Sequence, residues 1–559
     1  EEVVRNRLDA RDRRHVRDEE AAQKMLTRLR SAYTADGADH RARHLTADYL
    51  DRVIEAVTIP EEDDEIWLYN TETGAWDKQG ETVIASICEE ALGPQWRTAV
   101  RREVLGKIRD RHRESAETAW DPRPGVPADV LPVANGLLKL PTNKTGRAGD
   151  GPELVEHTPD ARTKNALPVE YDPDATGEIF REFLLEIVDD RDGYADTLEE
   201  VIGQILLPDN RNPMLPILHG AGGNGKGVLE RVLSEFVGES LSSVELDKLE
   251  ENQFAMNSMI GNMVNFVPDT DATRLNSINT LKKITGGDTV EVEPKGGDSH
   301  MTRPRTSLIF GANRPPIFPE DNYAIARRIL PIPLPVRFVE DPDPDEPMER
   351  QRDRNREQEL TTDTALTDVL ACALLGLERY EKGGTWSHPL DAGERAAEYR
   401  RESDTIVAAC EDLLVECAGE KAPKAAVYDA YSNYARSRGR DPVQPSTFWK
   451  RYGKTELPSR DGRPKAPDGD GRERVIHGIA LTGAAYRELS DEWRSHPWVV
   501  DGCEASGQFD GQDTSADAPT TDDLARVLDA IDAETPPALE VAERLADATG
   551  VDIDTAQRV

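Results

Sequence analysis

The sequence has little of what places a protein in a membrane or cross-links it. No apolar run reaches the ~18 residues of a membrane-spanning helix. The first residues, "EEVVRNRLDARDRRHVRDEE", contain no apolar core of a signal peptide. The five cysteines are odd in number and scattered, without a C-x-x-C pair or a Cys/His cluster. We therefore expect a soluble, cytoplasmic protein with no membrane partner, no zinc site and no disulfide.

Basic residues are also scarce. Lys and Arg total 69 against 107 Asp and Glu, which gives a formal net charge of -38, and most of the basic residues are arginine. This composition resembles that of proteins from salt-loving archaea, in which molar salt screens surface charges within ~3 Å. Because the overall field would repel nucleic acid, any DNA contact must come from local basic groups.

The 559 residues are too many for one hydrophobic core, and a typical domain size of ~150 residues predicts three or four domains. Residue 1 is Glu and the chain stops inside an apparent helix, so we expect both ends to belong to a longer protein. In chain order we expect a charged helical segment (1–60), a small α+β accessory domain (61–175), a helical collar (176–213), an α/β core (214–338), a linker and helical lid (339–401), a winged-helix domain (402–495), an acidic linker (496–524) and an incomplete helical module (525–559).

Local patterns support this division. "EIWLYNTETGAW" predicts a hairpin around Thr73 and Gly74, and strands alternate with helices from 214 to 338, which is typical of a parallel sheet with crossovers. Residues 339–362 form a charged connection, and helix returns from 363 to 401. From Ser403, "SDTIVAACEDLLVECAG", "KAAVYDAYSNYARSRG" and "QPSTFWKRYGK" predict three helices, and "RERVIHGIALT" predicts a strand, an arrangement that suggests a winged helix-turn-helix.

The stretch "PILHGAGGNGKGVLERVL" contains the spacing G-x-x-x-x-G-K from Gly220 to Lys226. A short apolar strand precedes it, and an apolar stripe from Val228 to Val237 predicts a helix packed on a sheet. Backbone N–H groups at a helix N-terminus bind phosphate, whereas the alternative is a glycine-rich turn without a ligand. The residues that we expect around a nucleotide are Gly220, Gly222, Gly223, Asn224, Gly225, Lys226, Gly227 and Val228.

Polar residues follow two further predicted strands. Asp269 follows the apolar residues 263–267 and a proline, and Asn313 follows "SLIFGA". Asp269 is suited to orienting magnesium and Asn313 to polarising a water, although an acid after a strand is more often a turn residue. Arg327 and Arg328 precede an apolar strand and are suited to a γ-phosphate of a neighbouring subunit, although paired arginines are usually surface charge.

The chain resembles the superfamily 3 helicases in the order and spacing of five features. They are Lys226, "VPDTD", "LKKITGGDTVEVEPK", "IFGANRPP" and "AIARRILPIPLPVRF". The resemblance is to the phage/plasmid primase-helicase family related to the poxvirus primase-helicase, in a haloarchaeal type. "WLYNTETGAW", "LPVANGLLKL" and "HTPDARTKNALPVEYDPDA" resemble the accessory domain of that family, and 403–487 resembles its C-terminal winged helix. The resemblance covers residues 61–490.

The resemblance implies a multidomain α/β protein with an AAA+-like P-loop core, built on a parallel sheet. It also implies a homo-oligomeric ring, expected to be a hexamer, with ATP and Mg²⁺ between subunits. By position in the motifs, Gly220, Gly225 and Lys226 bind phosphate, Asp269 holds Mg²⁺ through water, and Asn313 senses the γ-phosphate. Arg327 or Arg328 is the arginine finger, which one subunit supplies to the ATP of its neighbour.

The alternation of Val290 and Val292 before "PKGG" predicts a strand that enters a tight turn. In such helicases this hairpin lines the central channel and grips single-stranded DNA. Lys295 at its tip is the first candidate for a phosphate contact, and Lys282, Lys283 and His300 are weaker candidates. The alternative is a solvated loop lysine.

Gly227 stands where a metal-binding hydroxyl normally follows the lysine. Magnesium keeps several waters, so this loss should weaken metal binding without abolishing the site. The sequence therefore favours an ATP-dependent DNA helicase that acts in replication of a virus, plasmid or integrated element. The alternatives are a P-loop initiator or loader that does not unwind DNA, and a non-catalytic scaffold. No primase motif is found in 1–60, so priming belongs to a partner or to a domain outside this sequence.

Overall fold

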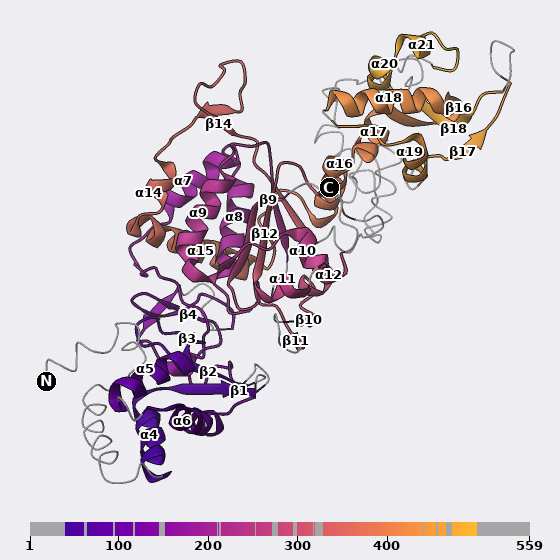
Figure 1. Ribbon diagram of the computed structural model, residues 1–559. Helices are drawn as coiled ribbons and strands as arrows, with labels where there is room; N and C mark the ends of the chain where they lie inside the picture. The colour runs from indigo at the N-terminus through magenta and orange to yellow at the C-terminus, as the bar shows by residue number, and fades with distance from the viewer. Residues whose placement is uncertain are drawn as a thin grey trace, which may run out of the picture. The chain divides into compact units, whose positions relative to one another are not determined.

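A computed structural model of the chain divides into two compact units, the first ending at Ser403 and the second beginning at Asp404 (Figure 1). No helix among the described residues is long and apolar enough to cross a membrane. The structure describes residues 40–60, 64–92, 96–115, 118–144, 151–209, 211, 214–251, 253–270, 278–293, 299–316, 318, 328–438, 440–453, 455, 457–465 and 472–499.

The first unit begins with a small α+β module whose three-stranded antiparallel sheet has the order β1-β2-β3. The hairpin predicted around Gly74 is confirmed: Tyr69 pairs with Trp76, and Gly74 has a φ of 73°, which favours glycine. The apolar faces of three helices pack on this sheet. The elements are α4 (His40–Val53), β1 (Ala56–Ile59), β2 (Glu65–Tyr69), β3 (Trp76–Asp77), α5 (Gly80–Leu92) and α6 (Thr98–Arg111).

The boundary predicted between residues 60 and 61 differs from the structure. β1 lies before it and pairs with β2 after it, from Ala56 opposite Leu68 to Ile59 opposite Glu65. Residues 40–60 therefore belong to this first α+β module and are not part of a separate helical segment. The four-residue run "AVTI" is too short for its periodicity to separate a strand from the end of a helix.

A second small sheet, in the order β4-β5-β6, follows from "LPVANGLLKL". Its strands are β4 (Val130–Val133), β5 (Gly136–Lys139) and β6 (Glu153–Val155). Asp129, which precedes β4, accepts a hydrogen bond of 2.7 Å from Nη1 of Arg211 beside the central sheet. This buried carboxylate joins the second sheet to the region before the core.

The centre of the first unit is a five-stranded sheet in the order β13-β7-β12-β9-β8, and every pair is parallel. The predicted parallel sheet with crossovers is confirmed. Its strands are β7 (Leu215–His219), β8 (Leu241–Ser242), β9 (Val264–Thr270), β12 (Ser307–Ala312) and β13 (Ile329–Pro333).

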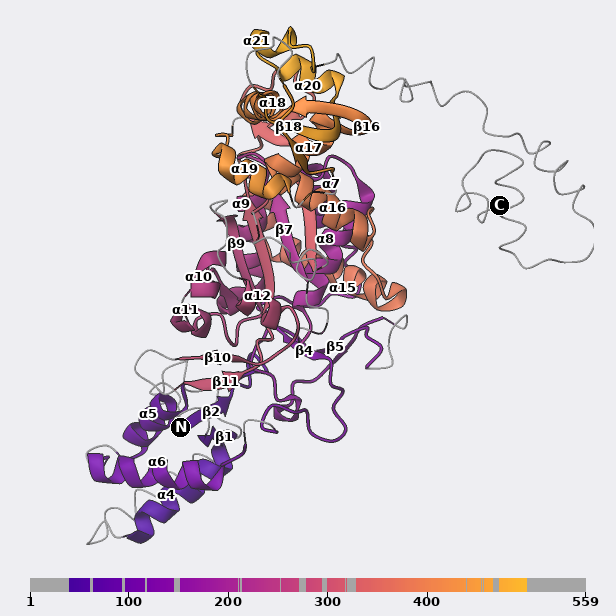
Figure 2. The same cartoon turned by 90° about the vertical axis from the view of Figure 1, so that its right-hand side faces the viewer.

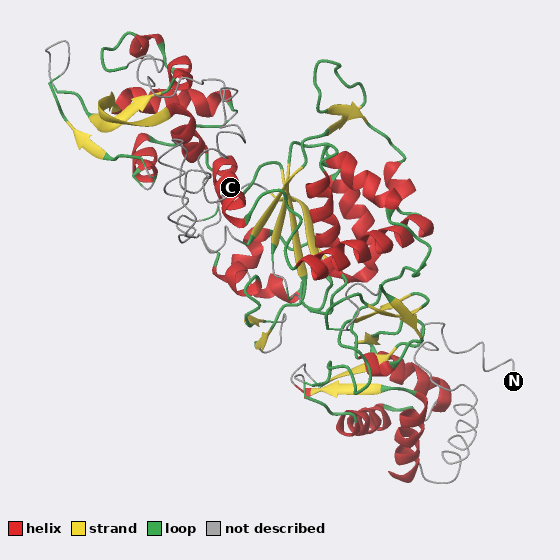
Figure 3. Cartoon of the chain, turned by 180° about the vertical axis from the view of Figure 1, so that it is seen from behind, coloured by secondary structure: helices red, strands yellow, loops and turns green. Residues whose placement is uncertain are grey.

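Helices cover both faces of this sheet (Figures 1 and 3). One hydrophobic cluster joins one face to α7 (Glu178–Ile187), α8 (Asp192–Ile205), α9 (Lys226–Val237) and α15 (Asp363–Gly383). A second cluster joins the other face to α10, α11 and α12. The remaining helices of the first unit are α10 (Leu246–Glu251), α11 (Gln253–Asn257), α12 (Asn279–Ile284), α14 (Arg356–Leu360) and α16 (Ala392–Ser403).

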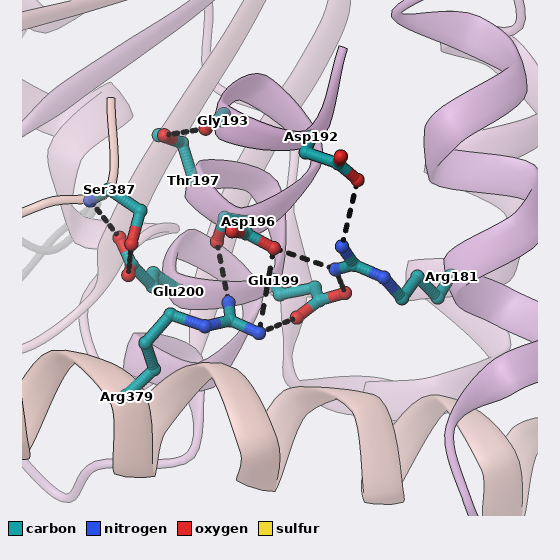
Figure 4. A network of polar contacts seen from close by, with 9 residues as sticks. All are labelled: Arg181, Asp192, Gly193, Asp196, Thr197, Glu199, Glu200, Arg379 and Ser387. Atoms are coloured by element: carbon teal, nitrogen blue, oxygen red, sulfur yellow. Dashed lines mark hydrogen bonds and ion pairs between the residues drawn. The ribbon is translucent and has the colours of Figure 1, made fainter. Parts of the chain in front are cut away.

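Helices α7, α8 and α15 are joined by a buried polar network (Figure 4). The Glu199 side chain on α8, 1% exposed, pairs with Arg181 of α7 and with Arg379 of α15, whose Nη2 lies 2.7 Å from Oε2. A Cβ atom on Gly376 would lie 2.2 Å from the Glu199 carbonyl oxygen, so glycine allows α15 to approach α8 closely. The network fixes the helical layer that packs behind the sheet.

The two ends of the sheet carry different appendages. At the edge where β12 begins, β10 (Val290–Val292) and β11 (His300–Thr302) form an antiparallel hairpin beside α12 (Figure 2). At the opposite edge, after β13, β14 (Arg337–Val339) pairs with β15 (Glu349–Gln351). The segment predicted as a charged connection therefore contains a short two-stranded sheet.

Among the described residues, the second unit contains five helices and a three-stranded antiparallel sheet in the order β16-β18-β17. One hydrophobic cluster joins them. The elements, in chain order, are α17 (Thr405–Leu413), β16 (Leu414–Pro423), α18 (Lys424–Ser437), α19 (Pro445–Tyr452), β17 (Arg460–Gly462), β18 (Val475–Leu481), α20 (Gly483–Glu488) and α21 (Asp491–Arg494).

The first helix predicted here is too long. "SDTIVAACEDLLVECAG" was expected to be helical throughout, but α17 ends at Leu413 and residues 414–423 form β16. β16 pairs with β18, with Leu414 opposite Leu481 and Ala422 opposite Ile476. This pairing with a strand about 60 residues later outweighs the local helix preference, because β propensity depends on context.

Candidate nucleotide-binding site

The glycine-rich loop connects β7 to α9. All five residues of β7 are buried, and α9 begins at Lys226. Gly225 caps the helix with a φ of 89°, and a Cβ atom there would lie 2.6 Å from Cγ2 of Ile187. Only glycine combines this backbone conformation with this close approach. The loop therefore ends at a helix N-terminus, where unpaired N–H groups accumulate.

The segment after β13 holds this loop from one side. The N–H of Leu334 donates to the His219 carbonyl at 2.8 Å, and the N–H of Phe338 donates to the Gly223 carbonyl at 2.7 Å. Nδ2 of the buried Asn224 donates to the Leu334 carbonyl at 3.4 Å. Gly220 is required here, because a Cβ atom would lie 2.1 Å from the Leu334 carbonyl oxygen. The loop is thus fixed by the chain itself.

Lys226 is only 6% exposed, and its Nζ donates to the Gly220 carbonyl at 2.9 Å. Burial lowers the pKa of Lys226, while the negative charge of Asp269 acts in the opposite direction. A Cβ atom on Gly311 of β12 would lie 2.0 Å from the Pro268 carbonyl oxygen and 2.9 Å from Cδ of Lys226. Because Gly311 has no side chain, the Lys226 side chain has room to lie across β12 and β9.

Asp269 and Asn313 lie at the same edge of the sheet. Asp269 is exposed near the end of β9, and Asn313 is exposed directly after β12. β12 and β9 are neighbours, and Ala312 lies opposite Thr270. The structure therefore brings Lys226, Asp269 and Asn313 to one edge, from three adjacent strands.

Two observations bear on whether ATP and Mg²⁺ fit these residues. A Cβ atom on Gly222 or Gly227 would meet no heavy atom within 4 Å, so the space outside the loop and the first helical turn is open. The hydroxyl of Thr270, beside Asp269, is buried and has no hydrogen-bond partner among the described residues. The one exposed carboxylate of Asp269 fits a Mg²⁺ whose other ligands are water and nucleotide phosphates.

Arg328 lies at the opposite edge of the sheet. Its carbonyl accepts a hydrogen bond from the N–H of Leu215 at 2.7 Å, and its Nη1 donates to the Lys282 carbonyl at 3.3 Å. β7 extends from Leu215 to the loop over about 13 Å, at ~3.3 Å per residue. Arg328 is therefore not brought to the glycine loop of its own chain. Arg327 lies outside the described residues.

The candidate DNA-binding residues lie at this same opposite edge. Lys283 is exposed and Lys282 half-buried on α12, and His300 opens β11. The predicted hairpin is confirmed by the pairing of Val292 with His300. Lys295, the expected tip residue, lies outside the described residues.

Two groups near the loop were not predicted. His219, 8% exposed, ends β7, and its Nε2 lies 3.4 Å from Oε2 of Glu402 on α16. Burial and the positive charges of Lys226 and Arg191 lower the pKa of His219 to about 4. At neutral pH the ring is therefore uncharged, and its contact with Glu402 is a polar contact and not an ion pair. The position of His219 directly before Gly220 was a usable sequence signal, but nothing in the sequence pointed to Glu402.

Two family models match this chain. Residues 2–189 match the family described as D5 N terminal like, a span that includes α4, β1 and both small sheets. Residues 218–328 match a family of unknown function (DUF5906), a span that contains the glycine loop, Asp269, Asn313 and Arg328. No curated protein matches the chain.

Solved structures of the C-terminal region of NrS-1 are similar to this chain at low identity. One, the A form apo structure, has 13% identity and a TM-score of 0.39 and covers 76% of this chain and 96% of that chain. Another structure of this region has 16% identity and a TM-score of 0.31, and covers 56% and 77% of the two chains. The D5 N terminal like match supports a relationship of residues 2–189 to a phage or viral primase-helicase-like family.

Proposed function

We propose that this chain is an ATP-dependent DNA helicase of the superfamily 3 type. It would translocate on single-stranded DNA in the cytoplasm, during replication of a virus, plasmid or integrated element. The observation that carries the proposal is the meeting of Lys226, Asp269 and Asn313 at one sheet edge, around a glycine loop that opens a helix.

In this proposal the β7–loop–α9 unit is a P-loop in an AAA+-like core. N–H groups from Gly222 to Val228 bind the phosphates, whereas the N–H of Gly220, also expected there, already donates to the Ala312 carbonyl at 3.2 Å. Lys226 exchanges its hydrogen bond to the Gly220 carbonyl for β and γ oxygens. β12 stands between β7 and β9, so Asn313 comes between the loop and Asp269, where it orients the attacking water.

Magnesium would be held by Asp269 through water, together with the phosphates of the nucleotide. When bound, the ion supplies positive charge to the β and γ oxygens. The protein contributes one exposed carboxylate and, at Gly227, no hydroxyl.

The proposal requires more than one copy. Arg328 lies a strand length away from its own loop, so its guanidinium can serve only the γ-phosphate of a neighbouring copy. Arg327 stays the alternative finger expected from the sequence. We propose a ring, expected to be hexameric, in which the β10–β11 hairpins and the side chains of Lys282, Lys283, Lys295 and His300 face single-stranded DNA.

The second unit is proposed to be a winged helix that binds duplex DNA. Its helices and antiparallel strands alternate in the order α17, β16, α18, α19, β17, β18. Residues 404–499 contain 15 acidic and 15 basic residues, whereas the whole chain has a net charge of -38. A neutral unit in so acidic a chain is the part best able to approach phosphates.

The test is ATP hydrolysis by the full chain in molar KCl, with and without oligo(dT). We expect DNA-stimulated hydrolysis in the wild type, loss of hydrolysis in Lys226→Ala, and loss of the stimulation alone in Lys295→Ala. Hydrolysis that is indifferent to both substitutions would reject the site.

The second candidate is a P-loop initiator or loader that binds ATP and DNA without unwinding, and the missing hydroxyl at Gly227 favours it. Unwinding of a forked duplex by the isolated protein separates the two. Strand separation that requires Lys226 supports the helicase, whereas ATP-dependent DNA binding without strand separation supports the initiator.

A further inference from the structure

Helix α16 contacts both loops that flank the proposed nucleotide site. Glu402 lies 3.4 Å from His219, the residue directly before the glycine loop. The hydroxyl of the buried Tyr399 donates to the Pro316 carbonyl at 2.7 Å, and its ring lies 5.8 Å from that of Phe318. Pro316 lies three residues after Asn313. One turn of α16 therefore contacts the segments that carry Lys226 and Asn313.

The contact between Glu402 and His219 is electrostatically sensitive to what binds at the loop. Lys226 and Arg191 hold His219 in its neutral form, while burial and Glu398 raise the pKa of Glu402 to about 7. A triphosphate beside Lys226 adds negative charge that offsets these cations. The pKa of His219 then rises, so a larger fraction of the ring is imidazolium and its attraction to Glu402 increases.

Helix α16 ends where the first unit ends, and one residue in an extended conformation separates it from α17 of the second unit. α16 ends at Ser403, and Asp404 is the N-cap of α17, accepting a hydrogen bond from the Ile406 N–H at 2.9 Å. Asp404 also forms an ion pair with Arg451 on α19. Glu402 and Asp404 are thus two positions apart, and each is anchored to a different compact unit.

We propose that the segment from Tyr399 to Asp404 couples nucleotide occupancy of the glycine loop to the second unit, with Glu402 as the coupling residue. This inference rests on the proposed function. Nucleotide binding strengthens the Glu402–His219 contact and orders the end of α16, and the Asp404–Arg451 pair passes this change to α19. Because coupling is reciprocal, a ligand on the second unit changes nucleotide affinity by the same factor.

The experiment measures amide hydrogen exchange of the full chain in molar KCl, with and without saturating AMP-PNP and Mg²⁺. Wild type is compared with Glu402→Gln, Glu402→Asp, Lys226→Ala and the matched control Glu394→Gln, an exposed glutamate about two turns earlier on α16. In wild type we expect AMP-PNP to slow exchange in peptides covering 216–230 and in peptides covering 399–412. Glu402→Gln should keep the first protection and lose most of the second, about fivefold or more in exchange rate.

Glu402→Asp should restore part of the protection over 399–412, Glu394→Gln should resemble wild type, and Lys226→Ala should show neither protection. A purely structural role of Glu402 predicts faster exchange in the absence of nucleotide and an unchanged response to it, which would overturn the coupling. Protection of 216–230 without protection of 399–412 in wild type would also overturn it, while leaving the nucleotide site intact. Absence of protection at 216–230 in wild type would overturn the nucleotide site itself and, with it, the coupling.

Discussion

The two edges of the five-stranded sheet differ in how many residues of the proposed nucleotide site a single chain brings together. At the edge where the strands end, Lys226, Asp269 and Asn313 lie together, and hydrogen bonds from Leu334 and Phe338 fix the loop. At the edge where the strands begin, Arg328 and the lysines of α12 lie near the β10–β11 hairpin, away from the glycine loop.

Under the proposed function, this difference divides the reaction between copies of the chain. Binding of the nucleotide would need only the first edge, whereas hydrolysis and the grip on DNA would need the second edge of a neighbour. Helices α7, α8 and α15 pack behind the sheet and hold the two edges in a fixed relation, because the Glu199 network leaves that layer little freedom (Figure 4).

The largest expected effect tests whether the second edge acts in trans. In one of the single variants Arg327→Ala and Arg328→Ala, kcat for ATP hydrolysis should fall by roughly 10³-fold, because an arginine finger contributes at least this much. Affinity for a fluorescent ATP analogue should stay within a few-fold of wild type. The other variant serves as the matched control.

Mixing two inactive variants tests more directly whether the arginine acts in trans. The inactive arginine variant and Lys226→Ala should regain hydrolysis when combined, because a mixed interface joins an intact loop to an intact arginine. If the mixture is only as active as the two separate proteins added together, each chain uses its own two edges for hydrolysis. The arginine would then not act in trans.

The next effect belongs to the first edge. Lys226→Ala should lower kcat/KM for ATP by about 10²- to 10³-fold, because it removes a preorganised positive charge from the phosphates. The fold should persist, since the lysine makes one hydrogen bond, to the Gly220 carbonyl. The control Lys248→Ala, exposed on α10, should hydrolyse ATP like wild type. Equal kcat/KM in the two variants would remove Lys226 from the site.

A smaller effect concerns single-stranded DNA at the second edge. Lys282→Ala and Lys283→Ala should each weaken oligo(dT) binding by up to about tenfold at low salt. The slope of log K against log salt should fall by ~0.7 for each lysine that neutralises a phosphate. Fluorescence anisotropy over a KCl series measures both quantities. A lower affinity with an unchanged slope would show that the lysine supports α12 and does not contact DNA.

The first edge was more predictable from sequence than the second unit. The glycine loop, Asp269 and Asn313 each follow a short apolar strand, and parallel strands bring such positions to one edge. Their roles remain predictions, but their convergence follows from local patterns. β16 was missed because its residues continue the helical pattern of α17, and only pairing with β18 determines the strand.

Other features depend on tertiary contacts that no local pattern records. β1 is defined by its pairing with β2, and Glu402 reaches His219 from 183 positions later in the chain. The lowered pKa of His219 arises from burial and from Lys226 and Arg191, which reach the ring from different elements. Such groups can be found only after the fold has brought the elements together.

The smallest expected effect tests whether the first edge binds Mg²⁺ fully without a hydroxyl at position 227. Gly227→Thr should lower the Mg²⁺ concentration for half-maximal ATP hydrolysis by about threefold to tenfold, or ~0.7–1.4 kcal/mol. A Cβ atom at this position meets no heavy atom within 4 Å, so the added side chain has space. Gly227→Ala is the control, because both substitutions improve helix propensity but only threonine adds an oxygen near the metal. An equal shift in the two variants would assign the gain to the helix. No shift in either would mean that water already fills the hydroxyl's place, so that Asp269 and the phosphates suffice to hold the metal.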